Sequence, residues 1–363
     1  MAKPAKAPSP IPEKTPRAYD FRMPAEWEPQ DAVWITWPAD ARLWPGLFKE
    51  ILPVFAELVA VISRYQYVLI NGANLVHDDI QRMLAKAGAH LDRTTLYDHA
   101  SNDVWCRDHG PIFVKNDAAD RLALTDWRFN GWGGKYAPFD QDDQIPRKIA
   151  RELKIPRFAF DITLEGGAID VNGAGTLMTT EAVLLNPNRK NPPRAQVEEA
   201  LREAFWVDQI LWLENGIHGD DTDGHIDNVA RFFKEDGILV ATEDDAADPN
   251  YKTLAKAQAR LIGAKTATDG RFDLVSIPMP APVLVGRERL AASYLNFLVV
   301  NSAVIVPQFG QADRDHRALE VLRECFPDRE LVPFRCNELL LEGGAVHCLT
   351  QQQPAVGEPP HEG

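Results

Sequence analysis

The densest group of side chains capable of chemistry lies in GIHGDDTDGHIDN at 216–228, where four aspartates and two histidines fall within thirteen positions. His225 and Asp227 stand two residues apart and lead into the apolar run NVARFF. If a strand begins here, a spacing of two places both side chains on one face. An imidazole and a carboxylate on one face can act together on a cationic substrate. The alternative is a solvated surface turn, since such loops are commonly rich in Asp and Gly.

The same stretch lacks the spacing of a metal site. Counted from Asp220 or Asp221, the sixth position of a calcium-binding loop is His225 or Ile226 instead of glycine. A zinc site would need further ligands that the spacing does not supply. The sequence therefore predicts that this cluster holds no metal.

A second cluster, NDVWCRDHGPIFV at 102–114, places Asp108 just before a strand-like run. An aspartate beside Trp105 suits a planar cation, because the ring offers a cation–π face and the carboxylate accepts two parallel N–H bonds. The alternative is a surface turn in which Arg107 and Asp108 pair with little effect on stability.

The chain has four cysteines, which are too few and too scattered for a disulfide framework, at positions 106, 325, 336 and 348. Cys348 follows a Gly-Gly pair and stands beside His347, whereas Cys106 is followed by Arg107, whose charge could lower the thiol pKa. A lone cysteine is more often a small buried hydrophobe than a nucleophile. Spacing alone leaves the choice between Cys348 and Cys106 open.

An internal echo points to a repeated architecture. LEGGAID at 164–170 recurs as LEGGAVH at 341–347, which is 177 positions later and about three units of roughly 59 residues. A repeated α/β module in a closed ring would explain the echo, and a coincidental Gly-Gly turn is the alternative. Within the first copy, Glu165 either orients a catalytic imidazole or is an ordinary turn residue.

Periodicity predicts an α/β fold with many short strands, which would present these residues at strand ends. Apolar residues at helical spacing predict helices over 47–65, 77–89 and 314–326. Short apolar runs predict β segments at 67–70, 111–114, 176–186, 209–213, 237–241 and 297–308.

Composition sets the wider context. The 363 residues carry a formal net charge of −14, which disfavours nucleic acid and anionic membranes as partners. No apolar run reaches the length of a membrane span or resembles a signal peptide, so we expect a cytoplasmic protein. The Pro-rich segment 1–19 predicts a flexible arm, 20–353 a single catalytic domain and 354–363 a flexible tail.

In combination, these stretches resemble the agmatine deiminase family, which is related to the bacterial-type peptidylarginine deiminases. The resemblance extends over nearly the whole body of the chain and rests on the order and spacing of six motifs. They are MPAEWEPQDAVWITWP (23–38), FNGWGGKY (129–136), LEGGAID (164–170), GDDTDGHIDN (219–228), ASYLNF (292–297) and GGAVHCLTQQQP (343–354). The resemblance implies the pentein fold, a five-bladed α/β propeller with pseudo-fivefold repeats around a central active site.

The resemblance also implies a role for each matching residue. The nucleophile falls on Cys348, the acid/base histidine on His225, and the guanidinium-binding carboxylates on Asp108 and Asp227. Glu165 supports the histidine. Substrate contacts are implied for Trp105 and Asn296, and we add Asp221 and Trp132 as candidate contacts to the substrate tail. The implied reaction converts agmatine to N-carbamoylputrescine and ammonia through a covalent thiouronium, without metal or organic cofactor.

Two departures from the family pattern bear on the substrate. Glu342 and Ala345 replace a glycine and an asparagine of the run that ends at the nucleophile. Deimination of another alkylguanidine or of peptidyl-arginine therefore stays open. A metal-dependent hydrolase that uses the Asp/His-rich loop and a non-catalytic guanidine-binding protein are the rivals from other classes. The partner expected is a small cationic guanidine, and a homo-oligomer is possible.

Overall fold

The computed structural model describes residues 14–357, which form five mixed β-sheets and one small hairpin. In each mixed sheet, a central strand pairs antiparallel with one neighbour and parallel with the next. The first sheet consists of β18 (Thr350–Pro354), β1 (Gln30–Thr36), β2 (Tyr67–Gly72) and β3 (Thr94–Asp98). The others are β4 (Ile112–Asn116), β5 (Arg121–Arg128) and β6 (Arg157–Thr163); β7 (Ile169–Val171), β8 (Thr176–Thr180) and β9 (Gln209–Leu213); β10 (Ala230–Lys234), β11 (Gly237–Thr242) and β12 (Asp273–Pro278); and β15 (Leu298–Val300), β16 (Ala303–Gln308) and β17 (Glu330–Arg335). The hairpin pairs β13 (Leu284–Val285) with β14 (Glu288–Arg289).

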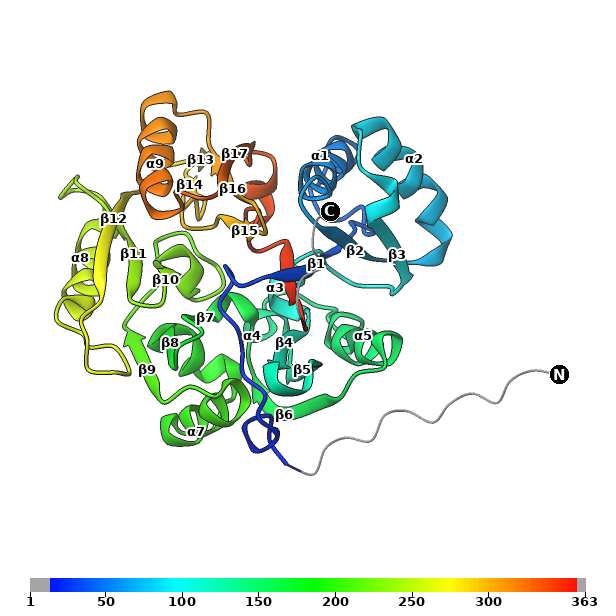
Figure 1. The fold of residues 1–363 in the computed structure, drawn as a ribbon. Coiled ribbons are helices and arrows are strands. Elements are labelled where there is room, and N and C mark those ends of the chain that lie inside the picture. Colours follow the sequence, from blue (N-terminus) through cyan, green and yellow to red (C-terminus); the bar gives the residue numbers. More distant parts are fainter. Residues whose placement is uncertain (1–13, 358–363) are drawn as a thin grey trace.

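Each parallel pair needs a crossover, and a helix supplies it. In Figure 1 these helices lie toward the outside of the molecule, and the units follow one another around its middle. The crossover helices are α1 (Phe48–Ile62), α2 (His77–Ala87), α5 (Ile145–Leu153), α7 (Arg194–Phe205), α8 (Pro249–Leu261) and α9 (Ala312–Cys325). Short helices α3 (Cys106–His109), α4 (Gly131–Gly134) and α6 (Glu181–Leu184) lie in connecting segments.

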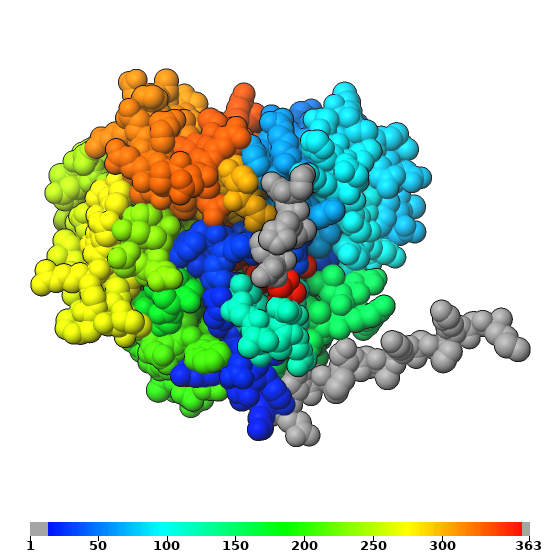
Figure 2. Space-filling view, in the orientation of Figure 1, coloured from blue at the N-terminus to red at the C-terminus, as the bar shows by residue number. Residues whose placement is uncertain are grey.

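The two ends of the described chain meet in one sheet. β1 pairs antiparallel with β18, so that Val33 stands opposite Gln352. In Figure 1 the dark blue β1 and the red C-terminal segment lie side by side near the middle. The space-filling view shows only a small area of that red segment between other parts of the chain (Figure 2). The last strand is therefore an internal part of the fold.

The five mixed sheets give the Gly-Gly echo a structural cause. LEGGAID leads into β7 and LEGGAVH leads toward β18. Each of these strands is the one that pairs antiparallel with the central strand of its sheet, and we call it the first strand of its unit. The two units lie three places apart when the five mixed sheets are taken in the chain order of their first strands. The recurrence of this strand pattern in five sheets is what a repeated α/β module would produce. Every residue to which the resemblance gives a central chemical role also precedes such a first strand. They are Asp108 before β4, Glu165 before β7, His225 and Asp227 before β10, Asn296 before β15, and Cys348 before β18.

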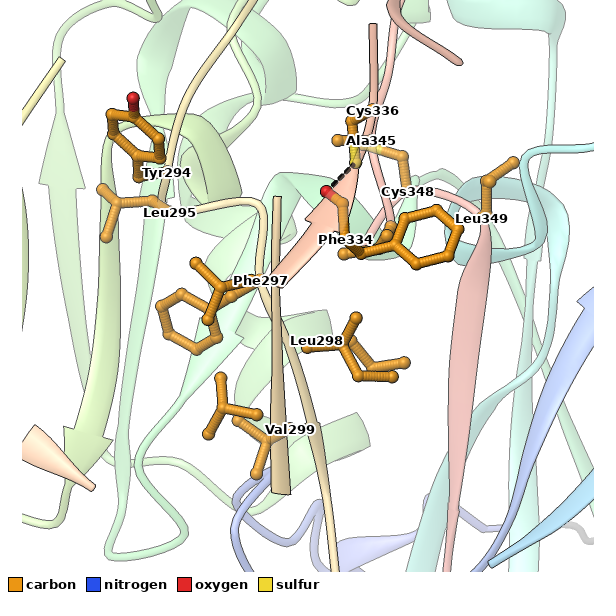
Figure 3. Packing of buried hydrophobic residues seen from close by; sticks show 14 of the residues in the cluster. Tyr294, Leu295, Phe297, Leu298, Val299, Phe334, Cys336, Ala345, Cys348 and Leu349 are labelled. Carbon is orange, nitrogen blue, oxygen red and sulfur yellow. Dashed lines mark hydrogen bonds between the residues drawn. The ribbon is translucent and has the colours of Figure 1, made fainter. Parts of the chain in front are cut away.

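An apolar layer supports these segments. Leu295, Phe297 and Leu298 are fully buried around the start of β15, close to the segment that carries Cys348 (Figure 3). The Cys336 thiol donates to the Phe334 carbonyl oxygen at 3.4 Å, which marks this cysteine as part of the core. Because interiors pack densely, such a layer fixes the backbone from which site residues project.

Local signals predicted most elements well. Helix α2 begins at His77 with two aspartates in its first turn and ends before Gly88, whose φ of 79° suits glycine. The predicted strand over 176–186 was wrong in its second half, which forms α6. There the Thr180 hydroxyl accepts from the Val183 amide at 3.3 Å and caps a helical turn in place of continuing the strand.

Part of the predicted N-terminal arm and C-terminal tail can be placed. Residues 1–13 and 358–363 lie outside the described residues. Within the predicted arm, the Thr15 hydroxyl donates to Glu203 at 2.6 Å and Arg17 pairs with Asp208 at 2.9 Å. At the other end, the Ala355 amide donates to the Pro29 carbonyl at 2.8 Å. Across 14–357, no helix has the length and apolar character needed to cross a bilayer.

Candidate active site

The thiol of Cys348 lies at the wall of a cavity that Asp108, Trp105 and Trp132 also line. Asn296 Nδ2 donates to the sulfur at 3.0 Å, and the sulfur lies 3.8 Å from Asp227 Oδ2. The side chain of Cys348 is thus held by polar contacts at a wall that a small molecule can reach.

Glycine at position 344 is needed for this arrangement. A Cβ there would lie 2.5 Å from the Trp105 ring and 2.9 Å from the Cβ of Cys348, closer than real contacts allow. The matching glycine of the first copy, Gly167, has the same function for the acid/base groups. A Cβ at Gly167 would lie 2.5 Å from His225 Nδ1 and 2.9 Å from Asp108 Oδ1. Both Gly-Gly pairs therefore leave room for side chains that converge from other units.

His225 lies fully buried among carboxylates. Its Nδ1 is 3.6 Å from Asp108 Oδ1, and its Nε2 is 3.9 Å from Glu165 Oε2. The other oxygen of Glu165 accepts a hydrogen bond from Arg189 Nε at 2.7 Å, which fixes the carboxylate. Neither ring nitrogen of His225 has a hydrogen-bond partner among the described residues, and both nitrogens are buried.

The surrounding charges set the protonation states of His225 and Cys348. Burial acts to lower the pKa of His225, but Asp108, Glu165 and Asp227 outweigh it and raise the pKa to about 10. Burial, with Asp227 and Asp108, raises the pKa of the Cys348 thiol well above its ordinary value. At neutral pH the resting site therefore holds an imidazolium and a protonated thiol.

Two carboxylates flank this thiol and form a fork. Asp108 accepts from Trp132 Nε1 at 3.0 Å and from the Gly167 amide at 3.2 Å. Asp227 Oδ2 contacts His347, whereas Asp227 Oδ1 is buried without a hydrogen-bond partner in the described chain. Because a lone buried carboxylate oxygen is costly, the fork favours a ligand that donates N–H bonds.

The mouth of the cavity is acidic and aromatic. Asp103, Asp221 and Glu342 line it together with Tyr136, whose hydroxyl donates to Asp221 Oδ2. Glu342 Oε1 accepts from the Trp44 amide at 2.7 Å. Burial raises the pKa of Asp103 to about 7, with smaller contributions from the neighbouring carboxylates. Bringing several carboxylates together raises their pKa values, and a bound cation relieves that repulsion.

Some aspartates of the Asp/Gly-rich loop stabilise the loop itself, and others lie in the site. Asp220 Oδ2 accepts from the His225 amide at 3.1 Å and its Oδ1 accepts from the Thr222 amide at 3.0 Å, so Asp220 shapes the turn. Asp223 pairs with Lys135 at 2.7 Å. The prediction that His225 and Asp227 share a strand face was wrong. His225 is the N-cap of the 3₁₀ turn Ile226–Asn228 and Asp227 lies within that turn, which brings both into the site before β10 begins.

The structure separates the two cysteines that sequence spacing left open. Cys106 is fully buried against Asn71, and burial raises its pKa to about 12, whereas Cys348 lines the cavity. Trp105, Trp132 and Asp221 line the same cavity. Asn296 contacts the sulfur of Cys348 instead of forming part of the cavity wall.

Sequence reasoning assigned no role to several residues in or beside the site. Asp103 and Tyr136 line the cavity, Arg189 fixes Glu165, and Glu26 reaches the site through His347. Each lies far along the chain from its partner, and only Glu26 and Tyr136 fall in stretches that carry the family resemblance.

Comparisons with known proteins agree with this geometry. The family model described as Porphyromonas-type peptidyl-arginine deiminase matches residues 22–354. The agmatine deiminase of Medicago truncatula is 36% identical, with 95% of this chain and 99% of the relative covered. That of Stutzerimonas stutzeri is 39% identical, with 94% and 97% covered.

Solved structures show the same likeness. The agmatine deiminase of Enterococcus faecalis superposes with a TM-score of 0.88 at 33% identity, covering 95% of this chain and 99% of that one. An agmatine deiminase of C. jejuni with substrate bound gives 0.84 at 31% identity, with 93% and 97% covered. The α/β fold expected from the sequence is therefore confirmed, and the chain belongs to the Porphyromonas-type peptidyl-arginine deiminase family.

Proposed function

We propose that this protein is an agmatine deiminase, which hydrolyses agmatine to N-carbamoylputrescine and ammonia through a covalent cysteine adduct. The observation that carries the proposal is the convergence of three units at one cavity with an acidic mouth. Cys348 and Asp108 line this cavity, and the next layer holds Asp227, 3.8 Å from the Cys348 sulfur, and His225, 3.6 Å from Asp108. Agmatine has a guanidinium at one end and an ammonium at the other, and this cavity has acidic groups suited to each.

The fork of Asp108 and Asp227 would hold the guanidinium. Each carboxylate accepts N–H bonds in the plane of the cation, and the unpartnered Asp227 Oδ1 supplies one free acceptor. The guanidinium carbon then lies in front of the Cys348 sulfur. Fixing the two reactants in this way converts a bimolecular encounter into an intramolecular step.

The arrival of the cation also activates the thiol. Asp227 and Asp108 raise the Cys348 pKa in the free protein, and a guanidinium between them offsets that effect. As the thiol loses its proton, an S–C bond forms and one C–N π pair moves onto nitrogen. The His225 imidazolium gives its proton to the departing nitrogen and the C–N bond breaks. The thiol proton leaves with the ammonia as ammonium.

The same histidine completes the reaction. His225 is neutral after the first step, so it can take a proton from water as the water oxygen attacks the thiouronium carbon. Collapse of the tetrahedral adduct breaks the S–C bond, and the hydroxyl proton passes to the sulfur. The products are a urea, the free thiol and an imidazolium, which restores the resting state. None of these steps calls on a metal or an organic cofactor.

Glu342 has a role in this scheme at the distal end of the substrate. Its carboxylate lines the mouth with Asp221 and Asp103, where the ammonium of agmatine would lie. Burial raises the Glu342 pKa and the Trp44 amide opposes that effect, so a nearby ammonium would favour the charged form. A second candidate substrate, an alkylguanidine with a more highly charged tail, is favoured by the three carboxylates that meet here.

The Glu342→Gln variant should raise KM for agmatine about 3- to 10-fold with little change in kcat. The reason is that loss of one partly exposed charge contact costs roughly 1 kcal/mol. The KM of a guanidine with an uncharged alkyl tail should stay the same. Glu338→Gln is the matched control, because Glu338 pairs with Arg335 at 2.7 Å away from the cavity. Equal KM values for Glu342→Gln and wild type would show that Glu342 does not bind the distal end of the substrate.

The arrangement of units supports a finer description of the fold. We infer that the five mixed sheets close into a pentein propeller with pseudo-fivefold symmetry and that 20–353 forms one catalytic domain. The support is the recurrent strand pattern and the β1–β18 pairing, which joins both ends of the chain in one unit. We also propose a cytoplasmic protein without nucleic-acid or membrane partners, since its four thiols are free and its net charge is −14.

The proposed function is tested by measuring ammonia release from agmatine, arginine and an arginyl peptide in parallel. Agmatine should have the highest kcat/KM. Protein quenched in acid during turnover should show a substrate-sized mass on the peptide that contains Cys348. Preference for the peptide would indicate a peptidyl-arginine deiminase. Activity lost to a chelator and restored by a divalent metal would favour a metal-dependent hydrolase, and binding without turnover a non-catalytic guanidine-binding protein.

A further inference from the structure

A buried histidine next to the nucleophile joins two carboxylates that lie far apart in the chain. His347 Nδ1 lies 2.8 Å from Asp227 Oδ2, and His347 Nε2 lies 2.7 Å from Glu26 Oε1. The His347 backbone amide is also held, by Asn296 Oδ1 at 3.1 Å. The imidazole is 1% exposed, so water does not compete for these contacts.

Each carboxylate calls for a hydrogen on the ring nitrogen that faces it, so the two contacts together favour an imidazolium, whereas burial, Arg107 and Arg231 act to lower the pKa of His347. Burial acts to raise the pKa of Asp227, but its hydrogen bond with His347 and the nearby charges lower it, so Asp227 is ionised. An ionised carboxylate can only accept, and a contact of 2.8 Å therefore requires a hydrogen on His347 Nδ1. Asp227 Oδ2 is thus engaged as an acceptor by an imidazole N–H.

Glu26 anchors the other side of the ring. Its Oε2 accepts from Arg231 Nη2 at 2.6 Å, and its Oε1 lies 3.3 Å from Arg107 Nη1. Arg231 is held in turn by the carbonyl oxygens of Leu295 and Phe297 at 3.1 and 3.2 Å. Because every member of this network is buried and bonded, His347 has little freedom to turn away from Asp227.

The network leaves Asp227 in one orientation. Its Oδ2 contacts His347 and, at 3.4 Å, Asn296, whereas its Oδ1 has no partner among residues 14–357. We propose that His347 and Glu26 are positioning residues that hold Asp227 with one oxygen engaged and the other presented to the substrate guanidinium. This inference rests on the proposed function, and it assigns roles to two residues that do not touch the substrate.

Two substitutions at one position separate positioning from simple space filling. In His347→Asn, the amide nitrogen falls near the place of Nδ1 and can still donate to Asp227. In His347→Gln, the amide nitrogen reaches the place of Nε2 and donates a hydrogen bond to Glu26. Asp227 then lacks the donor that His347 supplied. Both variants replace the ring by an amide, so both disturb the packing to a similar degree.

Agmatine binding is measured by calorimetry for each variant in a Cys348→Ala background, where no turnover occurs, and kcat/KM is measured with Cys348 present. The Gln variant should bind at least about tenfold more weakly than the Asn variant, and the same order should hold in kcat/KM. Thermal unfolding of both proteins should be similar. Equal affinities, or tighter binding by the Gln variant, would overturn the proposal.

An NMR signal that needs no substrate distinguishes failure of the positioning role from failure of the proposed function. In protein labelled with ¹⁵N-histidine, the hydrogen on His347 Nδ1 should give a downfield proton resonance that is lost in His347→Gln and shifted in Asp227→Asn. If agmatine does not bind at all while this resonance behaves as expected, the proposed function is wrong and the contact to Asp227 stands. If the resonance is unaffected by Asp227→Asn, the positioning role itself is wrong.

Discussion

Replacing Cys348 by alanine should reduce ammonia release from agmatine by a factor on the order of 10⁴ or more. The sulfur is the only cavity-lining thiol in the described chain, and without it the covalent adduct cannot form. Binding should survive, because the Asp108–Asp227 fork remains. The result is read from initial rates of ammonia release, and from the loss of the adduct in acid-quenched samples analysed by mass spectrometry.

Cys106→Ala provides the matched control for that experiment. Cys106 lies in a core cluster and does not line the cavity, so its substitution should affect stability while kcat/KM stays close to wild type. Full activity of Cys348→Ala would refute the covalent route. Loss of activity in Cys106→Ala with an unchanged unfolding temperature would identify Cys106 as the nucleophile.

The second large effect is expected for His225→Gln, with a loss of about 10²- to 10⁴-fold in kcat. His225 is the only described histidine that lies within 4 Å of both Asp108 and Glu165, and the proposed mechanism uses it in both half-reactions. Without it, the departing nitrogen lacks a proton donor and the water lacks a base. The loss should be measured under saturating agmatine, so that kcat is separated from binding.

His218→Gln is the control for this variant. His218 belongs to the same Asp/His-rich stretch but is exposed, and its substitution should leave kcat within experimental error. Added imidazole should restore part of the activity of a His225→Gly variant if the lost function is proton transfer. No loss in His225→Gln, or an equal loss in both variants, would contradict the assignment of His225.

Residues whose role depends on their immediate neighbours could be predicted from the sequence. Gly88 ends a helix and QILWL forms β9 as expected, because helix capping and short apolar runs are local properties. The motifs LEGGAID and GDDTDGHIDN pointed to Glu165, His225 and Asp227, since these residues sit in turns whose glycines and aspartates are visible in sequence.

The rest depends on contacts between distant parts of the chain. Spacing alone left the choice between Cys348 and Cys106 open, and the structure separates them because Cys348 lines the cavity whereas Cys106 does not. Glu26 lies 321 positions from His347, and its place in the motif at 23–38 gives no sign that its carboxylate reaches the site. The position of His225 and Asp227 on a 3₁₀ turn also escaped prediction, because spacing of two fits both a strand and a tight turn.

The pairing of the first and last strands has a consequence for biosynthesis. Cys348 stands two residues before β18, which is the final strand of the described chain and lies against β1. A growing polypeptide can fold the units from β4 to β17 as they emerge, but it lacks the proposed nucleophile until those units have all been synthesised. We therefore expect the proposed site to become complete only when β18 inserts beside β1, which was synthesised before all the other mixed-sheet strands of the described chain.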